Sequence, residues 1–168
     1  MVDIDYTPSG LGDEILSKEF VRWGDTTPNT ANPTWAVIGV GVEDGNANIE
    51  YNPQVDRTKW IIDKNARTSH KSNDKQMPIT QTCYKDDPMF EFVNACRDNV
   101  NNKTHILEAD TWNGSQGSYP ARKTDATIVV NTYNGNEITY TIYFDGDGEE
   151  GTISLSGNVP TFTPSTSL

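Results

Sequence analysis

The chain has 168 residues, which is enough for one domain with a single core and too few for two ordinary enzyme domains. Thirteen Lys and Arg against 24 Asp and Glu give a net charge of −11, which excludes a protein that captures nucleic acid by neutralising its phosphates. Only 34% of the residues are hydrophobic, yet four Trp, seven Tyr and five Phe are too many aromatics for a disordered acidic chain. The chain therefore folds around a small core.

No window approaches the roughly 18 apolar residues of a membrane span, and residues 1–12 lack the basic and apolar regions of a secretory signal. We therefore expect a protein that is made and kept in the cytosol. The cysteines Cys83 and Cys96 form no CxxC pair, and we expect both to be reduced core residues.

The first half of the chain predicts an N-terminal arm followed by a hairpin. Residues 1–33 have no sustained period and are predicted to be a partly extended arm, anchored by Trp23. A β domain is predicted over residues 34–156, starting with a strand at 35–39 and a turn at Asp44-Gly45. The return strand, predicted over 48–60, places Glu50, Asn52, Gln54 and Asp56 on one wet face.

A long polar loop is predicted at about residues 61–75, longer than strand connections usually are. A strand over 77–83 follows, and then one α-helix at about residues 87–100. Asp86 or Asp87 caps this helix, Pro88 suits its first turn, and apolar residues recur at helical spacing up to Val100.

The remainder is predicted to be β, with strands over 104–111, 126–133, 137–144 and 152–155. Asn134-Gly135 gives a strong hairpin signal between two of them. In the strand over 137–144, Glu137, Thr139 and Thr141 share a face. Residues 157–168 are predicted to be an extended C-terminal tail.

The motifs that could carry chemistry are weak, so we assign no catalytic, cofactor-binding or metal-binding residue. Residues 39–45 have the spacing GxGxxxG and no helix follows them, which argues against a phosphate site. The acidic turn at 145–150 lacks the Gly and Glu that an EF-hand requires, and only a weak cation site of another kind stays open there. His70 is expected to be solvated and His105 to be structural, because neither is paired with a nucleophile.

Charge is segregated along the chain. Residues 57–75 hold six of the 13 basic residues and only two acidic ones, Asp63 and Asp74, so that seven basic and 22 acidic residues remain elsewhere. An isolated run of this kind can be a solvated loop. It can also be a basic element that binds the acidic body of a second copy, and such a head-to-tail contact builds rings or filaments.

Several spaced signatures resemble the major tail tube proteins of long-tailed bacteriophages, especially those of phages of Gram-positive hosts. The resemblance covers roughly residues 35–162. It is carried by WAVIGVG at 35–41, NIEYNP at 48–53, WIID at 60–63, YKDDP at 84–88, GSYPA at 117–121, the hairpin at Asn134-Gly135, EGT at 150–152 and PTF at 160–162.

The resemblance implies a mainly β, sandwich- or barrel-like tail tube fold with one packed helix and no catalytic activity. It further implies a virion protein, assembled in the host cytoplasm, whose hexameric rings stack into a tube that conducts DNA without binding it specifically. Tail terminator, tape measure and distal tail proteins are implied as partners. The inner tube of a contractile tail or of a phage-derived bacteriocin shares the fold and is the first alternative. A carbohydrate-binding β-sandwich that uses Trp60, Trp112 and Tyr119 is a more distant one.

Two surfaces are expected if this resemblance holds. An acidic lumen avoids retaining DNA, because each neutralised phosphate adds affinity. The candidates for lining it are Glu50, Asn52, Gln54, Asp56, Glu137, Thr139 and Thr141. The basic loop is expected to join successive rings, since the matching loop of the resembled family reaches toward the neighbouring ring. The candidates for this contact are Lys64, Arg67, His70, Lys71 and Lys75, with Asp145, Asp147, Glu149 and Glu150 as the acidic receiver. The arm residues Asp3, Asp5, Asp13 and Glu14 are the alternative receiver.

Overall fold

The computed structural model describes residues 19–115, 117–156 and 159–166, and it confirms a mainly β fold with one helix in that part of the chain. The strands are β1 (Phe20–Asp25), β2 (Trp35–Val37), β3 (Pro53–Thr58), β4 (Arg67–Asn73), β5 (Gln76–Thr82), β6 (Asn102–Asp110), β7 (Tyr119–Tyr133), β8 (Glu137–Phe144), β9 (Glu149–Ser156) and β10 (Val159–Pro164), and the helix is α1 (Pro88–Ala95). None of the described helices is long and apolar enough to cross a membrane.

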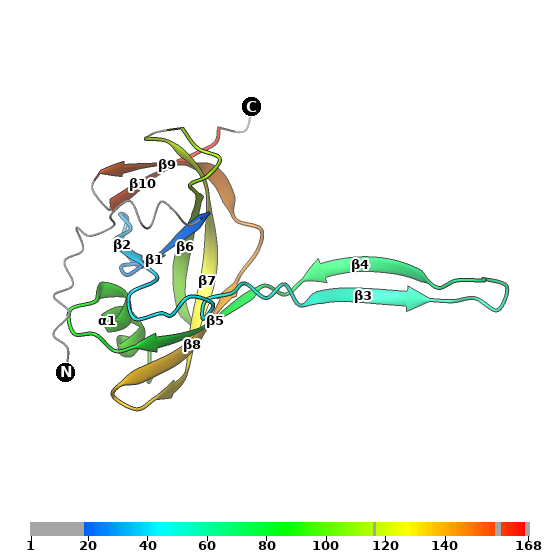
Figure 1. The fold of residues 1–168 in the computed structure, drawn as a ribbon, viewed down its shortest axis with the longest axis horizontal. Coiled ribbons are helices and arrows are strands. Elements are labelled where there is room, and N and C mark those ends of the chain that lie inside the picture. The colour runs from blue at the N-terminus through cyan, green and yellow to red at the C-terminus, as the bar shows by residue number, and fades with distance from the viewer. Residues whose placement is uncertain (1–18, 116, 157–158, 167–168) are drawn as a thin grey trace.

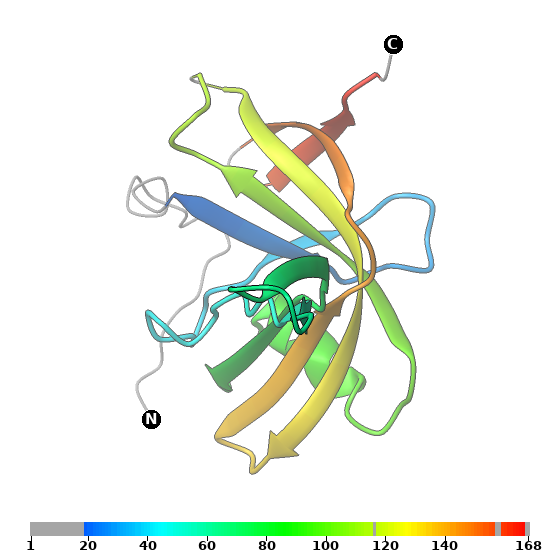
Figure 2. The same cartoon turned by 90° about the vertical axis from the view of Figure 1, so that its right-hand side faces the viewer.

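Eight strands form one curled antiparallel sheet, in the order β10-β9-β7-β6-β1-β2, with β8 pairing with both β7 and β5 (Figures 1 and 2). The 15-residue strand β7 connects its parts. Along one edge β7 pairs with β6, and along the other its first residues pair with β9 while residues 126–133 pair with β8. The sheet thereby curls around the helix and acquires its barrel-like shape.

Both faces of this sheet carry a hydrophobic cluster. On β6 the adjacent residues Ile106 and Leu107 are both fully buried, and because neighbouring side chains of a strand point to opposite faces, β6 is covered on both sides. The first cluster packs α1 against β5, β7 and β8, and includes Met89 and Tyr140. The second centres on Trp23 and gathers side chains from β1, β2, β6, β7, β9 and β10.

The helix begins as the sequence predicts. The Asp87 carboxylate accepts a hydrogen bond from the Phe90 backbone N–H at 3.1 Å, and Pro88 occupies the first turn. Asp87 is buried and also accepts from Gln81 Nε2 at 2.8 Å, while the Tyr140 hydroxyl donates to Gln81 Oε1 at 3.2 Å. This polar chain fixes the helix N-terminus to β5 and β8.

A pH dependence follows from the burial of Asp87, which raises the pKa of its carboxyl above the ordinary 3.8 although three hydrogen bonds oppose that rise. The folded state therefore holds this proton more tightly than the unfolded state, and the contribution of Asp87 to stability falls as pH rises from 3.8 through the folded pKa. In Asp87→Asn, which keeps a capping oxygen, this falling contribution is absent, so we expect the slope of the unfolding free energy against pH to be more positive over that range. Urea unfolding at a series of pH values tests this, and unchanged slopes would contradict it.

The ends of the predicted domain need correction. Residues 20–25 are not part of an arm, because β1 lies inside the sheet between β2 and β6, with Trp23 only 1% exposed. The described fold thus starts before the predicted boundary at residue 34. At the other end, residues 159–164 are not a free tail but pair with β9 as β10. Residues 1–18 of the predicted arm, and 157–158 and 167–168 of the predicted tail, lie outside the described residues.

The predicted hairpin of residues 35–60 is also wrong. The turn at Glu43–Asn46 exists, but β2 pairs with β1, and residues 47 and 50 bridge to β5 instead. The turn therefore closes a loop and not a hairpin, because the residues after it pair with β5 and not with β2.

The helix is shorter than the predicted range of 87–100. Cys96 caps it, and Val100, whose apolar character extended the prediction, is 86% exposed. Cys96 is buried and Cys83 half-buried, and both are free thiols whose pKa is raised by burial.

Candidate assembly surfaces

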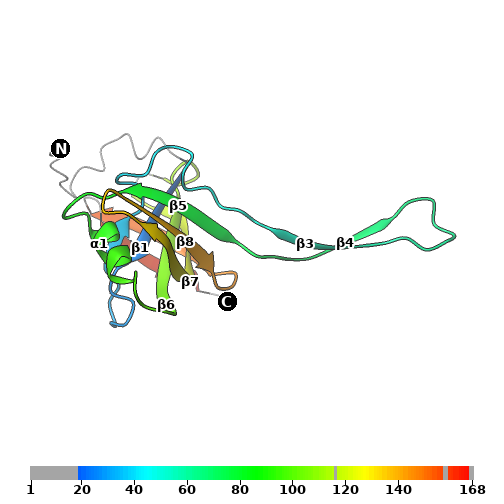
Figure 3. The same ribbon diagram turned by 90° about the horizontal axis from the view of Figure 1, so that it is seen from below.

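The predicted polar loop is instead part of a long β-hairpin that projects from the domain. We call residues 53–73, which comprise β3, the turn and β4, the projecting hairpin. Every residue of both strands is exposed, and two perpendicular views show the hairpin extending clear of the domain (Figures 1 and 3). The strand β4 was predicted as a loop because both faces of the hairpin are exposed to water, so its sequence shows no alternation of apolar and polar residues.

Cross-strand contacts hold the two strands of the projecting hairpin together. The register shifts between Gln54 and Val55, which leaves Lys71 without a direct partner on β3. This irregularity lets the Lys71 ammonium pair with the Asp56 carboxylate across the hairpin. Nearer the turn, Arg67 Nη2 lies 3.4 Å from Asp63 Oδ1, and the Asp63 carboxylate also accepts from the Trp60 backbone N–H. These exposed pairs contribute at most about 1 kcal/mol each.

The turn of the projecting hairpin carries three consecutive large apolar side chains. Trp60, Ile61 and Ile62 are 63%, 104% and 92% exposed, and we call them the tip. Lys59 and Lys64 flank them in the sequence. From the sequence, only Trp60 was given a role, as a carbohydrate-binding side chain, and none of the three was named as a ring-to-ring contact, although an apolar triplet between two polar runs was the signal that could have indicated it.

The candidates for the ring-to-ring contact divide between tip and root. Lys64 and Arg67 lie near the tip, while Lys75 lies at the root, where its ammonium is 5.6 Å from the centre of the Tyr51 ring. His70 and Lys71 lie along β4, and His70 Nε2 is 2.8 Å from the Asn73 side-chain oxygen. The structure thus confirms that His70 is solvated, and it spreads the five basic candidates along the hairpin.

Two carboxylates of the proposed acidic receiver already have partners within the chain, which the sequence did not indicate. Asp145 is exposed, but hydrogen bonds from Thr127 and Lys103 outweigh its slight desolvation and hold the pKa of its carboxyl below the ordinary value. Glu149 and Glu150 belong to strand β9 and not to a turn, and Glu150 pairs with Arg122 at 2.6 Å. Asp147 lies beside Lys75, at the root of the projecting hairpin of the same chain.

The candidates for the lumen do not share the single face that was predicted. Asn52 adopts a positive φ of 40° and the register shift follows at Gln54, so the alternation of residues 48–58 is broken. Asn52 therefore lies at the root, and Gln54 and Asp56 lie on the projecting hairpin. Glu50 stays on the domain, where its carboxylate accepts from Gln76 Nε2 at 2.6 Å.

Glu50 instead joins the second set of lumen candidates. Residues 47 and 50 bridge to β5, and β5 pairs with β8, so that Glu50 and Thr139 line one groove of about 280 Å³. Glu137 is exposed and Thr139 is half-buried, while Thr141 is only 7% exposed and accepts a hydrogen bond from Asn131. Thr141 is thus too deeply covered in the single chain to line an open channel.

The outer surface of β5, β8 and the adjoining part of β7 is rich in hydroxyl groups. We call it the hydroxyl face, and its members are Gln76, Pro78, Thr80, Thr127, Val129, Glu137, Thr139, Thr141 and Tyr143. Neither 76–82 nor 126–144 contains a Lys or Arg. The three strand segments of this face therefore supply no positive charge, and the ammonium of Lys103 on β6 lies at the edge of the face, where it donates to the Thr127 hydroxyl at 2.7 Å.

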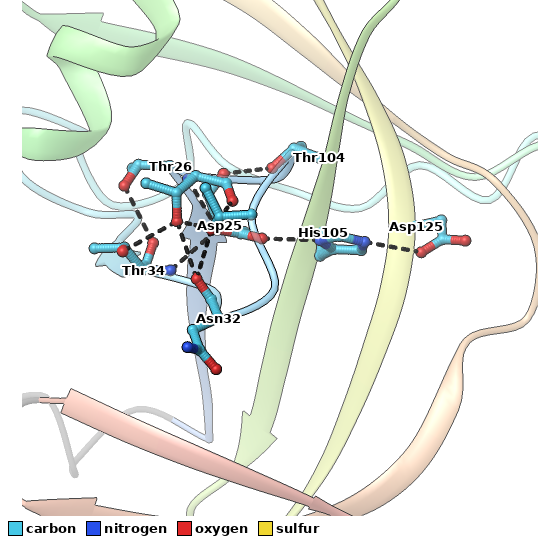
Figure 4. Close-up of polar contacts among 9 residues, drawn as sticks. Asp25, Thr26, Asn32, Thr34, Thr104, His105 and Asp125 are labelled. Atoms are coloured by element: carbon cyan, nitrogen blue, oxygen red, sulfur yellow. Dashed lines mark hydrogen bonds and ion pairs between the residues drawn. The ribbon is translucent and has the colours of Figure 1, made fainter.

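His105 is structural, as predicted. Its Nδ1 lies 2.9 Å from the buried Asp25 carboxylate and its Nε2 lies 3.5 Å from Asp125 (Figure 4). Asp25 also accepts from the backbone N–H groups of Thr27 and Thr34, at the two ends of the loop between β1 and β2. The network thus ties this loop to β6.

The structure separates the aromatic residues of the carbohydrate hypothesis, since Trp60 lies at the tip and Trp112 follows β6 on the domain. Within the described ranges, no three His, Cys, Asp or Glu side chains are placed to hold a metal ion.

No family model matches the chain, and no curated protein was found to be similar to it.

Proposed function

We propose that this protein is a structural subunit that polymerises into a tube of the phage-tail type, with the projecting hairpin joining successive rings. The observation that carries the proposal is the projecting hairpin itself, which extends clear of the domain (Figure 1) and whose apolar tip is exposed in the described part of the chain. Exposed apolar side chains of this size on a projecting element are typical of a binding site for another protein.

The energetics of the projecting hairpin support a partner. An isolated two-stranded hairpin is at best marginally stable in water, and the exposed ion pairs add little. The five basic residues of the hairpin oppose only two acidic ones, whereas the whole chain carries a net charge of −11. A second copy therefore offers both the apolar cover and the opposite charge that the hairpin lacks.

The hydroxyl face fits the conduit of such a tube. A wall that carried Lys or Arg would bind passing DNA through counterion release, and β5 and β8 carry neither. In this proposal the rings are hexameric, as the resemblance implies, and the tube belongs to a virion that also contains terminator, tape measure and distal tail proteins. The inner tube of a contractile tail or a bacteriocin would use the same subunit architecture.

Electron microscopy of the purified protein, combined with sedimentation over a range of concentrations, tests the proposal. We expect rings and stacked tubes with an open lumen, and a sedimentation coefficient that rises with concentration. Because ion pairs contribute to the contact, high salt should shorten the tubes without removing them. A protein that stays monomeric at high concentration would refute the proposal.

A charge substitution tests the conduit separately. In the variant Glu50→Lys with Thr139→Lys, two ammonium groups enter the groove on the hydroxyl face, and we expect tubes that form normally but retain DNA at moderate salt. The control is Val100→Lys, which adds one positive charge at an exposed position that follows α1, against the three that the test variant adds. DNA retention by purified tubes is the measurement, and equal retention by both variants would show that this face lies outside the lumen.

A further inference from the structure

A groove of about 450 Å³ lies over strands β1, β6, β7 and β9 of the domain. Two of its lining residues, Glu108 and Arg122, also line the pocket at the root of the projecting hairpin. We call it the β1–β9 groove, and its principal lining residues are Phe20, Glu108, Asp110, Pro120, Arg122 and Glu150. Of these lining residues, only Glu150 was among the receiver candidates that the sequence indicated.

Four charged side chains form one row across the sheet at this groove, because they are direct partners in neighbouring strands, and the last three of them line the groove. Arg22 faces Glu108, Glu108 faces Arg122, and Arg122 faces Glu150, which alternates positive and negative charge over four strands. Arg22 Nε lies 2.6 Å from Glu108 Oε2, and Arg122 Nη2 lies 2.6 Å from Glu150 Oε1. These pairs hold the walls of the groove in a fixed arrangement.

Beside this row the groove is apolar and acidic. Phe20 is 40% exposed and is the direct partner of Asp110 on β6. The Asn113 side chain donates to Asp110 at 2.6 Å, and this bond with two backbone N–H donors keeps the pKa of the Asp110 carboxyl below its ordinary value. Asp110 is therefore ionised at neutral pH, next to an exposed aromatic ring.

We propose that the β1–β9 groove receives the tip of the projecting hairpin from a second copy of this chain. The tip supplies apolar side chains for Phe20 and Pro120. Its flanking Lys59, Lys64 and Arg67 meet the Asp110 carboxylate, since Glu108 and Glu150 already pair with Arg22 and Arg122. The contact is head-to-tail, because tip and groove are different surfaces. This inference rests on the proposed function and adds to it the site where the hairpin binds.

Two complementary variants test the contact. Ile61→Asp places a charge in the tip, and Phe20→Lys places a positive charge in the groove, where it repels the basic flanks. We expect each variant alone to require more than a tenfold higher concentration for assembly than the unmodified protein, as loss of a central anchor does. In an equimolar mixture, the unaltered tip of Phe20→Lys can bind the unaltered groove of Ile61→Asp. The other tip and the other groove of that complex are both altered, so we expect assembly to stop after one tip-to-groove layer.

Sedimentation and mass photometry measure these species, thermal melting confirms that each variant is folded, and Val100→Lys is the control for added charge. A photo-crosslinker at residue 61 of the unmodified background should link to peptides containing Phe20 or Pro120 of another chain. If tubes form but Phe20→Lys assembles normally, or the crosslink falls elsewhere, the groove is refuted and the proposed function stands. If the unmodified protein forms no assembly, both are refuted.

Discussion

Replacing the tip by serine, in the variant Trp60→Ser, Ile61→Ser, Ile62→Ser, is expected to abolish tube growth while leaving the domain folded. The three side chains are among the most exposed apolar residues of the described chain, so their loss costs the monomer little. An interface loses about 2 kcal/mol or more for each central anchor, and a tube repeats that loss at every subunit. Electron microscopy at concentrations where the unmodified protein polymerises is the measurement.

The matched control for the tip is Val55→Ser, which removes an exposed apolar side chain from the middle of the projecting hairpin. We expect tubes of normal length from this variant, because one Val on a polar strand does not form an anchor. If the serine tip also polymerises normally, the tip is not the joining element. Deletion of residues 65–73 would then be expected to leave assembly intact as well.

The second large effect is expected at Trp23, which is almost completely buried in the second cluster although it lies in the segment predicted to be an arm. Trp23→Ala removes the largest side chain of that cluster and leaves a cavity, and such changes cost about 3–5 kcal/mol. Because single domains are stable by only about 5–15 kcal/mol, this variant should melt far below the unmodified protein.

Trp112→Ala is the control for the change at Trp23, because Trp112 is 63% exposed and its truncation leaves no cavity. We expect the unfolding free energy of this control to stay within about 0.5 kcal/mol of the unmodified value. Chemical denaturation followed by circular dichroism measures both variants. Equal stabilities would show that β1 can be released from the sheet and that the predicted arm boundary was right after all.

The parts of the fold that sequence predicted well are those in which local chemistry decides the structure. The helix start follows from a capping Asp and an early Pro, and the hairpin at Asn134-Gly135 follows from a turn with a positive φ at Gly135. The errors lie where tertiary pairing decides. Residues 35–37 pair backward with β1, and no local pattern distinguishes that from pairing forward across the turn at Gly45.

The candidate surfaces divide in the same way. The alternation of residues along β8 correctly predicted that Glu137 and Thr139 share a face. It could not predict that Glu50 lies near Thr139, because Glu50 is brought there by its pairing with β5, which in turn pairs with β8. Alternation also failed for Asn52 and Gln54, where a positive φ and a register shift interrupt the strand. The clustering of basic charge at residues 57–75 was visible in the sequence, whereas its presentation on a projecting hairpin required the structure.

Strand β7 has a consequence for how this domain comes apart. Its first residues pack into one hydrophobic cluster from one face, and its later residues pack into the other cluster from the opposite face. Unfolding of either cluster releases β7, and the other cluster also contains side chains of β7. We therefore expect the two halves of the sheet to unfold together. The two cores therefore behave thermodynamically as one, and damage at Trp23 weakens the distant hydroxyl face through the backbone that both share.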